Sequence, residues 1–179
     1  MDKLPIWFTK WLSKRAELPA KSVIVTDFLT FRDMADATTE DDDIAYISIC
    51  DTFYIEDDEK WMNVHYLPSS PDVLNLDFDD VSEDCEILCD DGKRLIDIKA
   101  ITREQGQKIA DFVDSLNGKH IIVHCHAGVS RSQGVAKAIW AERFDVYSPN
   151  EFNEFNPCLT PNYRVVAEVR RGFRMRDMK

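Results

Sequence analysis

The stretch HCHAGVSRS, from His124 to Ser132, constrains this chain more than any other segment. It follows the apolar run 121–123 directly, and it separates a cysteine from an arginine by five residues, with a glycine between them. A buried strand that enters a tight loop and leaves it as a helix turns successive backbone N–H groups toward one point, in front of the helix N-terminus. The sequence therefore predicts a loop that binds a dianion such as phosphate.

The predicted loop carries the groups for a complete reaction at phosphorus. The helix N-terminus and the neighbouring cation favour a thiolate on Cys125, which would attack phosphorus and form a cysteinyl-phosphate. Arg131 offers a planar fork for two phosphoryl oxygens, and Ser132 can donate a hydrogen bond to the sulfur. We expect His124 to order the loop from below and Gly128 to let the backbone turn. The residues predicted to surround the phosphate are His126, Ala127, Gly128, Val129, Ser130 and Arg131.

The pattern His-Cys-x-x-Gly-x-x-Arg-Ser at residues 124–132 resembles the active-site loop of the cysteine-dependent protein phosphatases. The short length of the chain resembles their dual-specificity branch, and the resemblance extends over residues 23–169. It implies a phosphatase that acts on a phosphorylated protein or peptide. Its substrates would be phosphotyrosine and also phosphoserine or phosphothreonine, because a short chain would offer a shallow pocket that tolerates both.

Three alternatives use the same loop. The first is a catalytically weak phospho-binding module, a pseudophosphatase, that uses the loop only to capture phosphate. A sulfurtransferase would require neither Ser132 nor an acid, and a phosphoinositide phosphatase lacks support because the loop's variable positions hold no lysine. Cys125, Arg131 and a positioned aspartate together favour the enzyme.

A phosphatase of this kind also needs a proton donor for the leaving oxygen. Residues 74–78 alternate as a strand does, and Asp79 and Asp80 follow at its end, where a loop could overhang the phosphate. In the family pattern, the acid lies two residues past the last apolar residue of the strand. By that similarity, Asp80 is the predicted general acid and Asp79 is the second candidate.

Apolar runs and helix signals alternate along the chain. They predict strands at 22–26, 44–50, 74–78 and 120–125, and helices at 29–36, 102–116, 130–144, 149–155 and from 160 onward. Strands separated by helices predict an α/β fold with a mainly parallel central sheet of four to five strands, helices on both faces, and the site at the carboxyl end of a central strand. The resemblance makes this sheet dual-specificity-phosphatase-like. One domain is expected to span residues 1–179.

Three segments add to this core. Residues 1–20 are a predicted helical extension, in which IWFTKWL at 6–12 indicates an amphipathic helix that packs onto the domain. Residues 85–98 predict an inserted β-hairpin, because Asp91-Gly92 is a strong turn signal between two runs rich in Ile and Leu. The hairpin is a flap over the substrate or an edge decoration, and the sequence leaves both open. The arginines within 170–176 predict a solvated helix end that complements the helix dipole.

The charge and composition of the chain limit the classes of partner that it is expected to bind. The net charge is −11; residues 1–20 carry four Lys and Arg against two acids, residues 160–179 six against two, and the segment between them twelve against twenty-nine. Such a chain should repel nucleic acid, and with no apolar run near 18 residues and no leader pattern it is expected to have no membrane partner and to be cytoplasmic.

Five cysteines without a Cys-x-x-Cys pair predict neither a disulfide framework nor a zinc site. Neighbouring strand residues face opposite ways, so residues 124–126 should not converge on a metal ion, and no cofactor is expected. The oligomeric state stays open.

Overall fold

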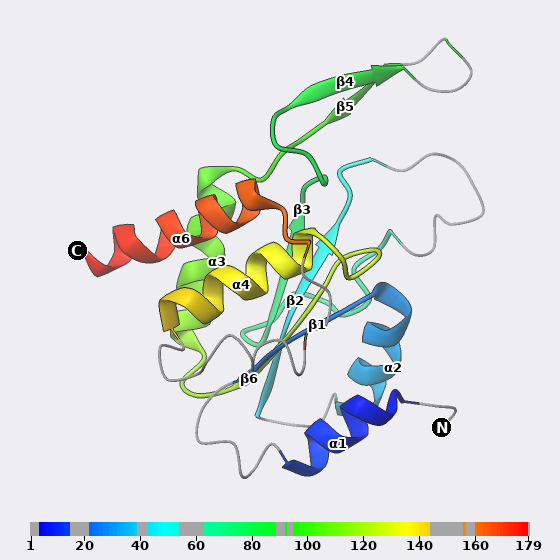
Figure 1. Cartoon of the computed structure of the whole chain (residues 1–179), viewed down its shortest axis with the longest axis vertical. Helices are drawn as coiled ribbons and strands as arrows, with labels where there is room; N and C mark the ends of the chain where they lie inside the picture. The colour runs from blue at the N-terminus through cyan, green and yellow to red at the C-terminus, as the bar shows by residue number, and fades with distance from the viewer. Residues whose placement is uncertain are drawn as a thin grey trace.

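The computed structural model describes residues 4–14, 22–38, 43–53, 63–88, 92, 95–143, 156 and 160–178 (Figure 1). Its helices are α1 (Ile6–Lys14), α2 (Phe28–Thr38), α3 (Arg103–Ser115), α4 (Arg131–Arg143) and α6 (Tyr163–Asp177). Its strands are β1 (Val23–Thr26), β2 (Ile44–Cys50), β3 (Val73–Asp77), β4 (Cys85–Leu88), β5 (Leu95–Ile98) and β6 (His120–His124). The helix predicted at 149–155 lies outside the described residues.

The central sheet has four parallel strands in the order β1-β6-β2-β3. Its register pairs Ser48 of β2 with His124 of β6, and Cys50 of β2 with Asp77 of β3. Because the strands are parallel, all four carboxyl ends lie at the same edge, and the residues that follow them meet there. The prediction of a mainly parallel sheet is confirmed.

Helices cover both faces of this sheet, as predicted: α3, α4 and α6 lie on one face, and α1 and α2 on the other (Figure 1). The strands β1 and β6 are buried on both faces, which explains their unbroken apolar runs. Ile121 and Val123 belong to the core under α3, α4 and α6, whereas Ile122 belongs to the core under α1 and α2. Because apolar side chains on both of its faces are buried, β6 is held in place at the point where it enters the loop.

The N-terminal helix packs on the domain, as its sequence predicted. Phe8 and Trp11 of α1 are fully buried, and the indole N–H of Trp11 donates to Ser22 Oγ at 2.8 Å. No helix in the described part of the chain has the length and the apolar character that a membrane span requires.

The side chains of Arg170, Arg174 and Arg176 on α6 are 40, 62 and 41% exposed, as a solvated helix end predicts, and they also pair with acids of neighbouring helices. Arg170 pairs with Glu142 of α4 at 2.5 Å, and Arg176 pairs with Asp111 of α3 at 2.9 Å. Sequence reasoning missed these pairs because the partners lie on helices that become neighbours of α6 only in the fold. The cations therefore fasten α6 to α3 and α4.

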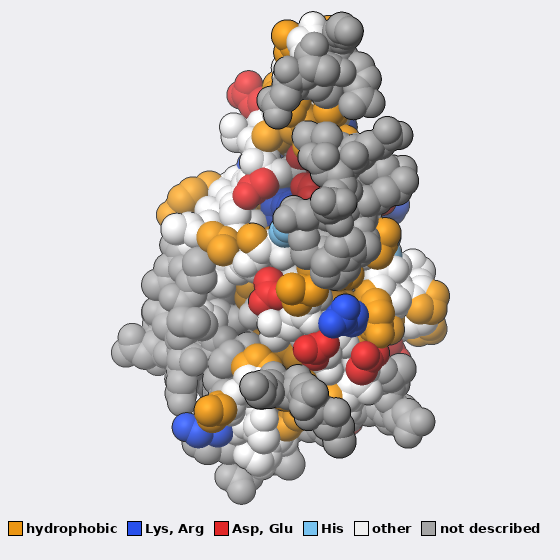
Figure 2. All heavy atoms as spheres, turned by 90° about the vertical axis from the view of Figure 1, so that its right-hand side faces the viewer, with side chains coloured by type: hydrophobic (Ala, Val, Ile, Leu, Met, Phe, Trp, Pro, Cys, Tyr) orange, Lys and Arg blue, Asp and Glu red, His pale blue; other side chains and the backbone are white. Residues whose placement is uncertain are grey.

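The antiparallel pair β4–β5 forms where the sequence predicted a hairpin and projects from the body of the molecule (Figure 1). Gly92, between the two strands, has a φ of 65°, a value that suits a turn glycine. Ile87, Leu88 and Leu95 are 41, 59 and 64% exposed, and apolar side chains show at the top of the molecule in Figure 2. On the rest of that face, acidic and basic side chains are intermingled rather than gathered by sign.

Candidate active site

The predicted loop joins the carboxyl end of β6 to the first residue of α4. Its carbonyl oxygens are engaged from outside: His126 O accepts from Phe28 N at 3.1 Å, Val129 O from Thr160 Oγ1 at 3.1 Å, and Ser130 O from Gly134 N at 2.9 Å. In a trans peptide, the N–H of the next residue points opposite to the carbonyl. The N–H groups of residues 127, 130 and 131 therefore point away from these outer donors, toward the inside of the loop. This is the arrangement expected of an anion-binding nest.

Gly128 is required at its position for two reasons. Its φ is 68°, in the left-handed region that side chains disfavour. A Cβ built there would also lie 2.6 Å from Asp27 N and from Thr26 C. The loop thus packs against the end of β1 at a distance that only glycine allows.

Cys125 lies at the bottom of the loop and is 2% exposed. Its Sγ is 3.2 Å from Oγ of Ser132, which lies in the first turn of α4. The two residues that the sequence assigned to the nucleophile and to its hydrogen-bond donor are therefore in contact.

The Arg131 side chain is buried and held by two acceptors. Its Nη1 lies 2.6 Å from Asp51 Oδ1 and donates to Phe78 O at 2.9 Å. Among the described residues, none offers a hydrogen-bond partner to its buried Nε. A buried donor without an acceptor is costly, so this atom favours an anion as its partner. Asp51 was missed by the sequence analysis, although its place directly after β2 puts it at the same sheet edge as Cys125.

The structure separates the two candidate acids. Asp80 is exposed, and its Oδ1 accepts from Ser130 Oγ of the loop and from Asn162 Nδ2, both at 2.8 Å. Asp79 is 2% exposed and accepts from Thr52 N at 2.9 Å, from the Thr52 hydroxyl, and from Lys99 N at 2.7 Å. Asp80 therefore contacts the loop that is predicted to bind phosphate, whereas Asp79 connects the segments around Thr52 and Lys99.

Asn162 was not singled out from the sequence. Its side chain caps α6 by accepting from Arg164 N and Val165 N while its amide N–H donates to Asp80. The helix start was expected at residue 160, so Asn162 was not recognised as the residue that both caps α6 and donates to Asp80.

His124 is the last residue of β6 and lies directly before the loop. Its Nε2 is 2.7 Å from Ser48 Oγ, its Nδ1 is 3.4 Å from the carbonyl oxygen of Cys125, and its ring packs against Phe31. Burial lowers the pKa of His124 to about 3, so the ring is neutral at ordinary pH. His126 lies partly exposed in the loop, and Ala127 and Val129 are exposed.

Cys50, His65 and Asp77 form a further cluster whose potential ligand atoms lie within 4.8 Å of one another. Cys50 Sγ lies 3.4 Å from His65 Nδ1, whereas Asp77 Oδ1 lies 3.1 Å from His65 Nε2. The two groups contact different ring nitrogens. Hydrogen bonds among the three side chains account for these contacts without a metal ion.

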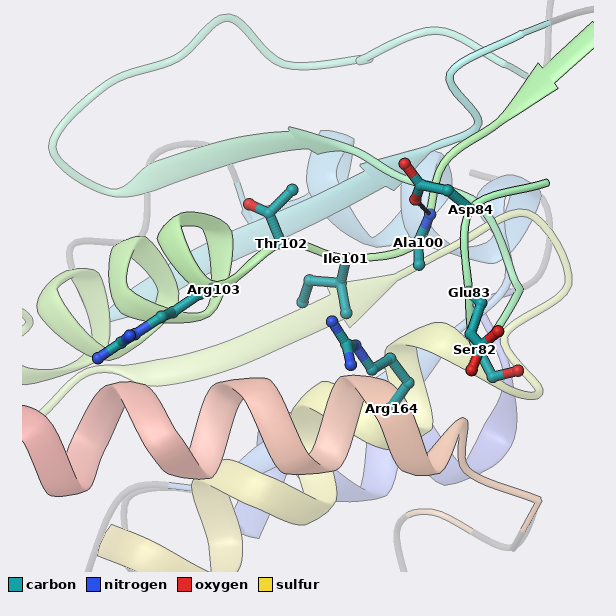
Figure 3. Close-up of a pocket in the computed structure, with 8 residues that line it drawn as sticks. All are labelled: Ser82, Glu83, Asp84, Ala100, Ile101, Thr102, Arg103 and Arg164. Atoms are coloured by element: carbon teal, nitrogen blue, oxygen red, sulfur yellow. Dashed lines mark hydrogen bonds between the residues drawn. The ribbon is translucent and has the colours of Figure 1, made fainter.

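A cavity of about 380 Å³ lies beside the candidate site, at the base of the hairpin (Figure 3). It is lined by Ser82, Glu83, Asp84, Ala100, Ile101, Thr102, Arg103 and Arg164. In Figure 3, Arg164 extends from α6 toward Ile101, whereas Arg103 points away along α3. The cavity adjoins the segment that follows Asp80 but contains none of the predicted catalytic residues.

Comparisons with solved structures identify the fold. The chain superposes on the human tyrosine phosphatase-like serine/threonine/tyrosine-interacting protein with a TM-score of 0.53 and 16% identity, over 88% of this chain and 94% of that chain. This is the fold of the cysteine-dependent protein phosphatases. The phosphatase PTP-2 of Cydia pomonella matches with a TM-score of 0.50 and 14% identity, over 83% of this chain and 84% of that chain. DUSP15 matches with a TM-score of 0.50 and 16% identity, over 88% and 89%. The fold predicted from the loop is confirmed.

Neither a family model nor a curated protein matches the chain.

Proposed function

We propose that this protein is a phosphatase that hydrolyses phosphotyrosine, and also phosphoserine or phosphothreonine, in protein or peptide substrates. The observation that carries the proposal is the contact of Cys125 with Ser132 inside a loop whose buried Arg131 keeps an N–H without an acceptor among the described residues. A thiol, a hydroxyl and a guanidinium around one nest of N–H groups suit the attack of sulfur on a phosphoryl group.

The proposed reaction has two steps. The Cys125 thiolate forms a bond to phosphorus while the bond from phosphorus to the leaving oxygen breaks, and Asp80 gives its proton to that oxygen. Water then attacks the cysteinyl-phosphate, Asp80 takes a proton from the water, and the thiolate leaves with a hydrogen bond from Ser132. Arg131 and the loop N–H groups hold the equatorial oxygens in both steps.

The position of Asp80 supports its role as general acid. Both hydrogen bonds from Ser130 and Asn162 go to Oδ1, so Oδ2 remains to carry the transferred proton. Since the Ser130 hydroxyl belongs to the loop, the acid is fixed relative to the bound phosphate. The sequence-based predictions of a cytoplasmic location and of a single domain over residues 1–179 stay predictions, as does a role of the hairpin as a flap.

Turnover of a phosphotyrosine peptide, a phosphothreonine peptide and an aryl phosphate tests the proposal. The Cys125→Ser variant should lose turnover and still bind inorganic phosphate, because the loop and Arg131 remain. Cys85→Ser is the matched control, since this exposed cysteine lies on the hairpin, and it should retain full activity. A parent protein that binds phosphate without turnover would support the alternative, a phospho-binding module, and an active Cys125→Ser would reject the covalent mechanism.

A further inference from the structure

A chain of contacts runs from the molecular surface to the backbone of the nucleophile. It begins at Asp77, whose side chain is 61% exposed and whose Oδ1 lies 3.1 Å from His65 Nε2. His65 Nδ1 lies 2.8 Å from Ser48 Oγ, and this oxygen lies 2.7 Å from His124 Nε2. His124 Nδ1 faces the carbonyl oxygen of Cys125 at 3.4 Å. We call these five residues the relay.

The relay has one hydrogen too few when both histidines are neutral and Asp77 is a carboxylate. It contains four contacts, and each needs a hydrogen. Ser48 supplies one, neutral His65 supplies one, and His124 supplies only one because its low pKa keeps it neutral. Cys50 adds a fifth contact, with Sγ 3.4 Å from His65 Nδ1, and brings its own hydrogen because burial raises the pKa of this thiol to about 12. This thiol also contacts Ser48, and its one hydrogen serves one of these two sulfur contacts. Among the four contacts of the relay itself, the shortage remains one hydrogen.

The contact without a hydrogen is the one between His124 Nδ1 and the Cys125 carbonyl oxygen. Leaving a contact of 2.7 or 2.8 Å without hydrogen would set two lone pairs against each other, so the 3.4 Å contact is the cheapest to leave empty. The Asp77 carboxylate fixes the hydrogen of neutral His65 on Nε2. His65 Nδ1 then accepts from Ser48, Ser48 accepts from His124 Nε2, and His124 Nδ1 is bare.

A second proton on His65 reverses these directions. His65 Nδ1 then donates to Ser48, Ser48 donates to His124 Nε2, and the hydrogen of His124 resides on Nδ1 and reaches the Cys125 carbonyl. The relay gains one proton from solvent in total, which leaves His65 cationic and His124 neutral in its other tautomer. Of the charged groups nearby, Asp77 contacts His65, whereas Arg131 and Asp27 act on His124.

We propose that His65 is a positioning residue, and that its protonation moves the hydrogen of His124 from Nε2 to Nδ1 and so fixes the peptide between Cys125 and His126. This inference rests on the proposed function. Because a peptide is planar, a donor that holds the Cys125 carbonyl also holds the His126 N–H, on the side opposite to it. Protonation of His65 then strengthens phosphate binding by the loop on the order of 2- to 10-fold, the effect of one neutral hydrogen bond.

Nitrogen-15 NMR of His124 tests the relay directly, because it distinguishes the two tautomers. In the parent protein, His124 should carry its hydrogen on Nδ1 at pH 5 and on Nε2 at pH 8. In Asp77→Asn, the amide can donate to His65 Nε2, which leaves the His65 hydrogen on Nδ1 and completes the relay without an extra proton. His124 should then stay protonated on Nδ1 at both pH values, and so it should in His65→Phe, where Ser48 is free to donate to it. His120→Gln, at the opposite end of β6, is the control and should switch like the parent.

Binding of inorganic phosphate gives a second measurement. At pH 8, Asp77→Asn should bind phosphate about 2- to 10-fold more tightly than the parent, and at pH 5 the two should bind alike. The comparison at each pH cancels the titration of phosphate itself. One tautomer at both pH values in the parent, or an unchanged switch in Asp77→Asn, would overturn the relay. A protein that switches tautomer but shows no turnover would instead refute the proposed function alone.

Discussion

Asp79→Asn and Asp80→Asn should have opposite consequences, although the two residues are adjacent. The Asp79 carboxylate is 2% exposed and accepts from two backbone N–H groups and a hydroxyl. An asparagine has one acceptor oxygen, so its NH₂ group must face the N–H of Thr52 or of Lys99. Losing one charged hydrogen bond and leaving a donor unsatisfied should lower the free energy of unfolding by about 2–4 kcal/mol. For a chain of this size, that corresponds to a fall in Tm of about 5–15 °C.

Asp80→Asn should leave stability almost unchanged and remove turnover. An asparagine can keep its Oδ1 toward Ser130 and Asn162, so both hydrogen bonds at 2.8 Å are retained and the stability change stays within about 0.5 kcal/mol. The variant has no proton to give, and turnover of a phosphotyrosine peptide should fall by about 10²- to 10⁴-fold. An activated aryl phosphate, whose leaving group needs no proton, should lose much less.

Thermal unfolding and turnover at 25 °C, measured on both variants with both substrates, check these expectations. The assignment is wrong by one residue if Asp79→Asn shows the leaving-group dependence and Asp80→Asn does not. If neither variant shows it, another group is the acid, and Asp77 and Asp97 are the next to test.

Three further predictions concern the loop and the strand beneath it. Arg131→Lys should abolish turnover and weaken inorganic phosphate binding by at least about tenfold in a calorimetric titration, because a single ammonium cannot replace the planar fork; equal binding would remove Arg131 from the site. Gly128→Ala should reduce phosphate binding and lower the free energy of unfolding by at least about 1–2 kcal/mol in urea, because the added Cβ meets the backbone of Thr26 and Asp27 at a positive φ; unchanged values would show that the loop has another conformation. The pKa of His124 is lower in the folded protein than in the unfolded chain, so protonation favours unfolding. Lowering the pH from 6.5 to 5 should therefore reduce the free energy of unfolding of the parent by about 2 kcal/mol, a loss that His124→Gln should not show. Parallel pH profiles of the two proteins would contradict this.

The loop and the sheet could be predicted because their signals are local. The run at 121–123 is apolar on both faces of a strand, and the residues that follow it carry their chemistry within one short segment. The helix predicted at 102–116 is another local case, because Thr102 and Gln105 form a capping box at its start and both hydrogen bonds of the box are present. Local patterns of this kind need no knowledge of the fold.

Other parts of the site could not be predicted because they depend on neighbours distant in sequence. Asp51 reaches Arg131 only because β2 lies beside β6, and Ser48 reaches His124 only through the register of those strands. His65 belongs to no helix or strand, and nothing in its surrounding sequence indicates that it contacts Ser48. The predicted parallel sheet placed Asp51 at the carboxyl end of a predicted strand, but the strand order, which sets β2 beside β6, was not available from the sequence.

Trapping of the covalent intermediate tests the central claim most directly. The protein is mixed with a ³²P-labelled phosphotyrosine peptide, quenched in acid within the first turnovers and digested. The label should appear on the peptide that contains Cys125, and it should be absent from Cys125→Ser treated in the same way. Rapid turnover of the substrate with no label on that peptide would contradict a cysteinyl-phosphate mechanism.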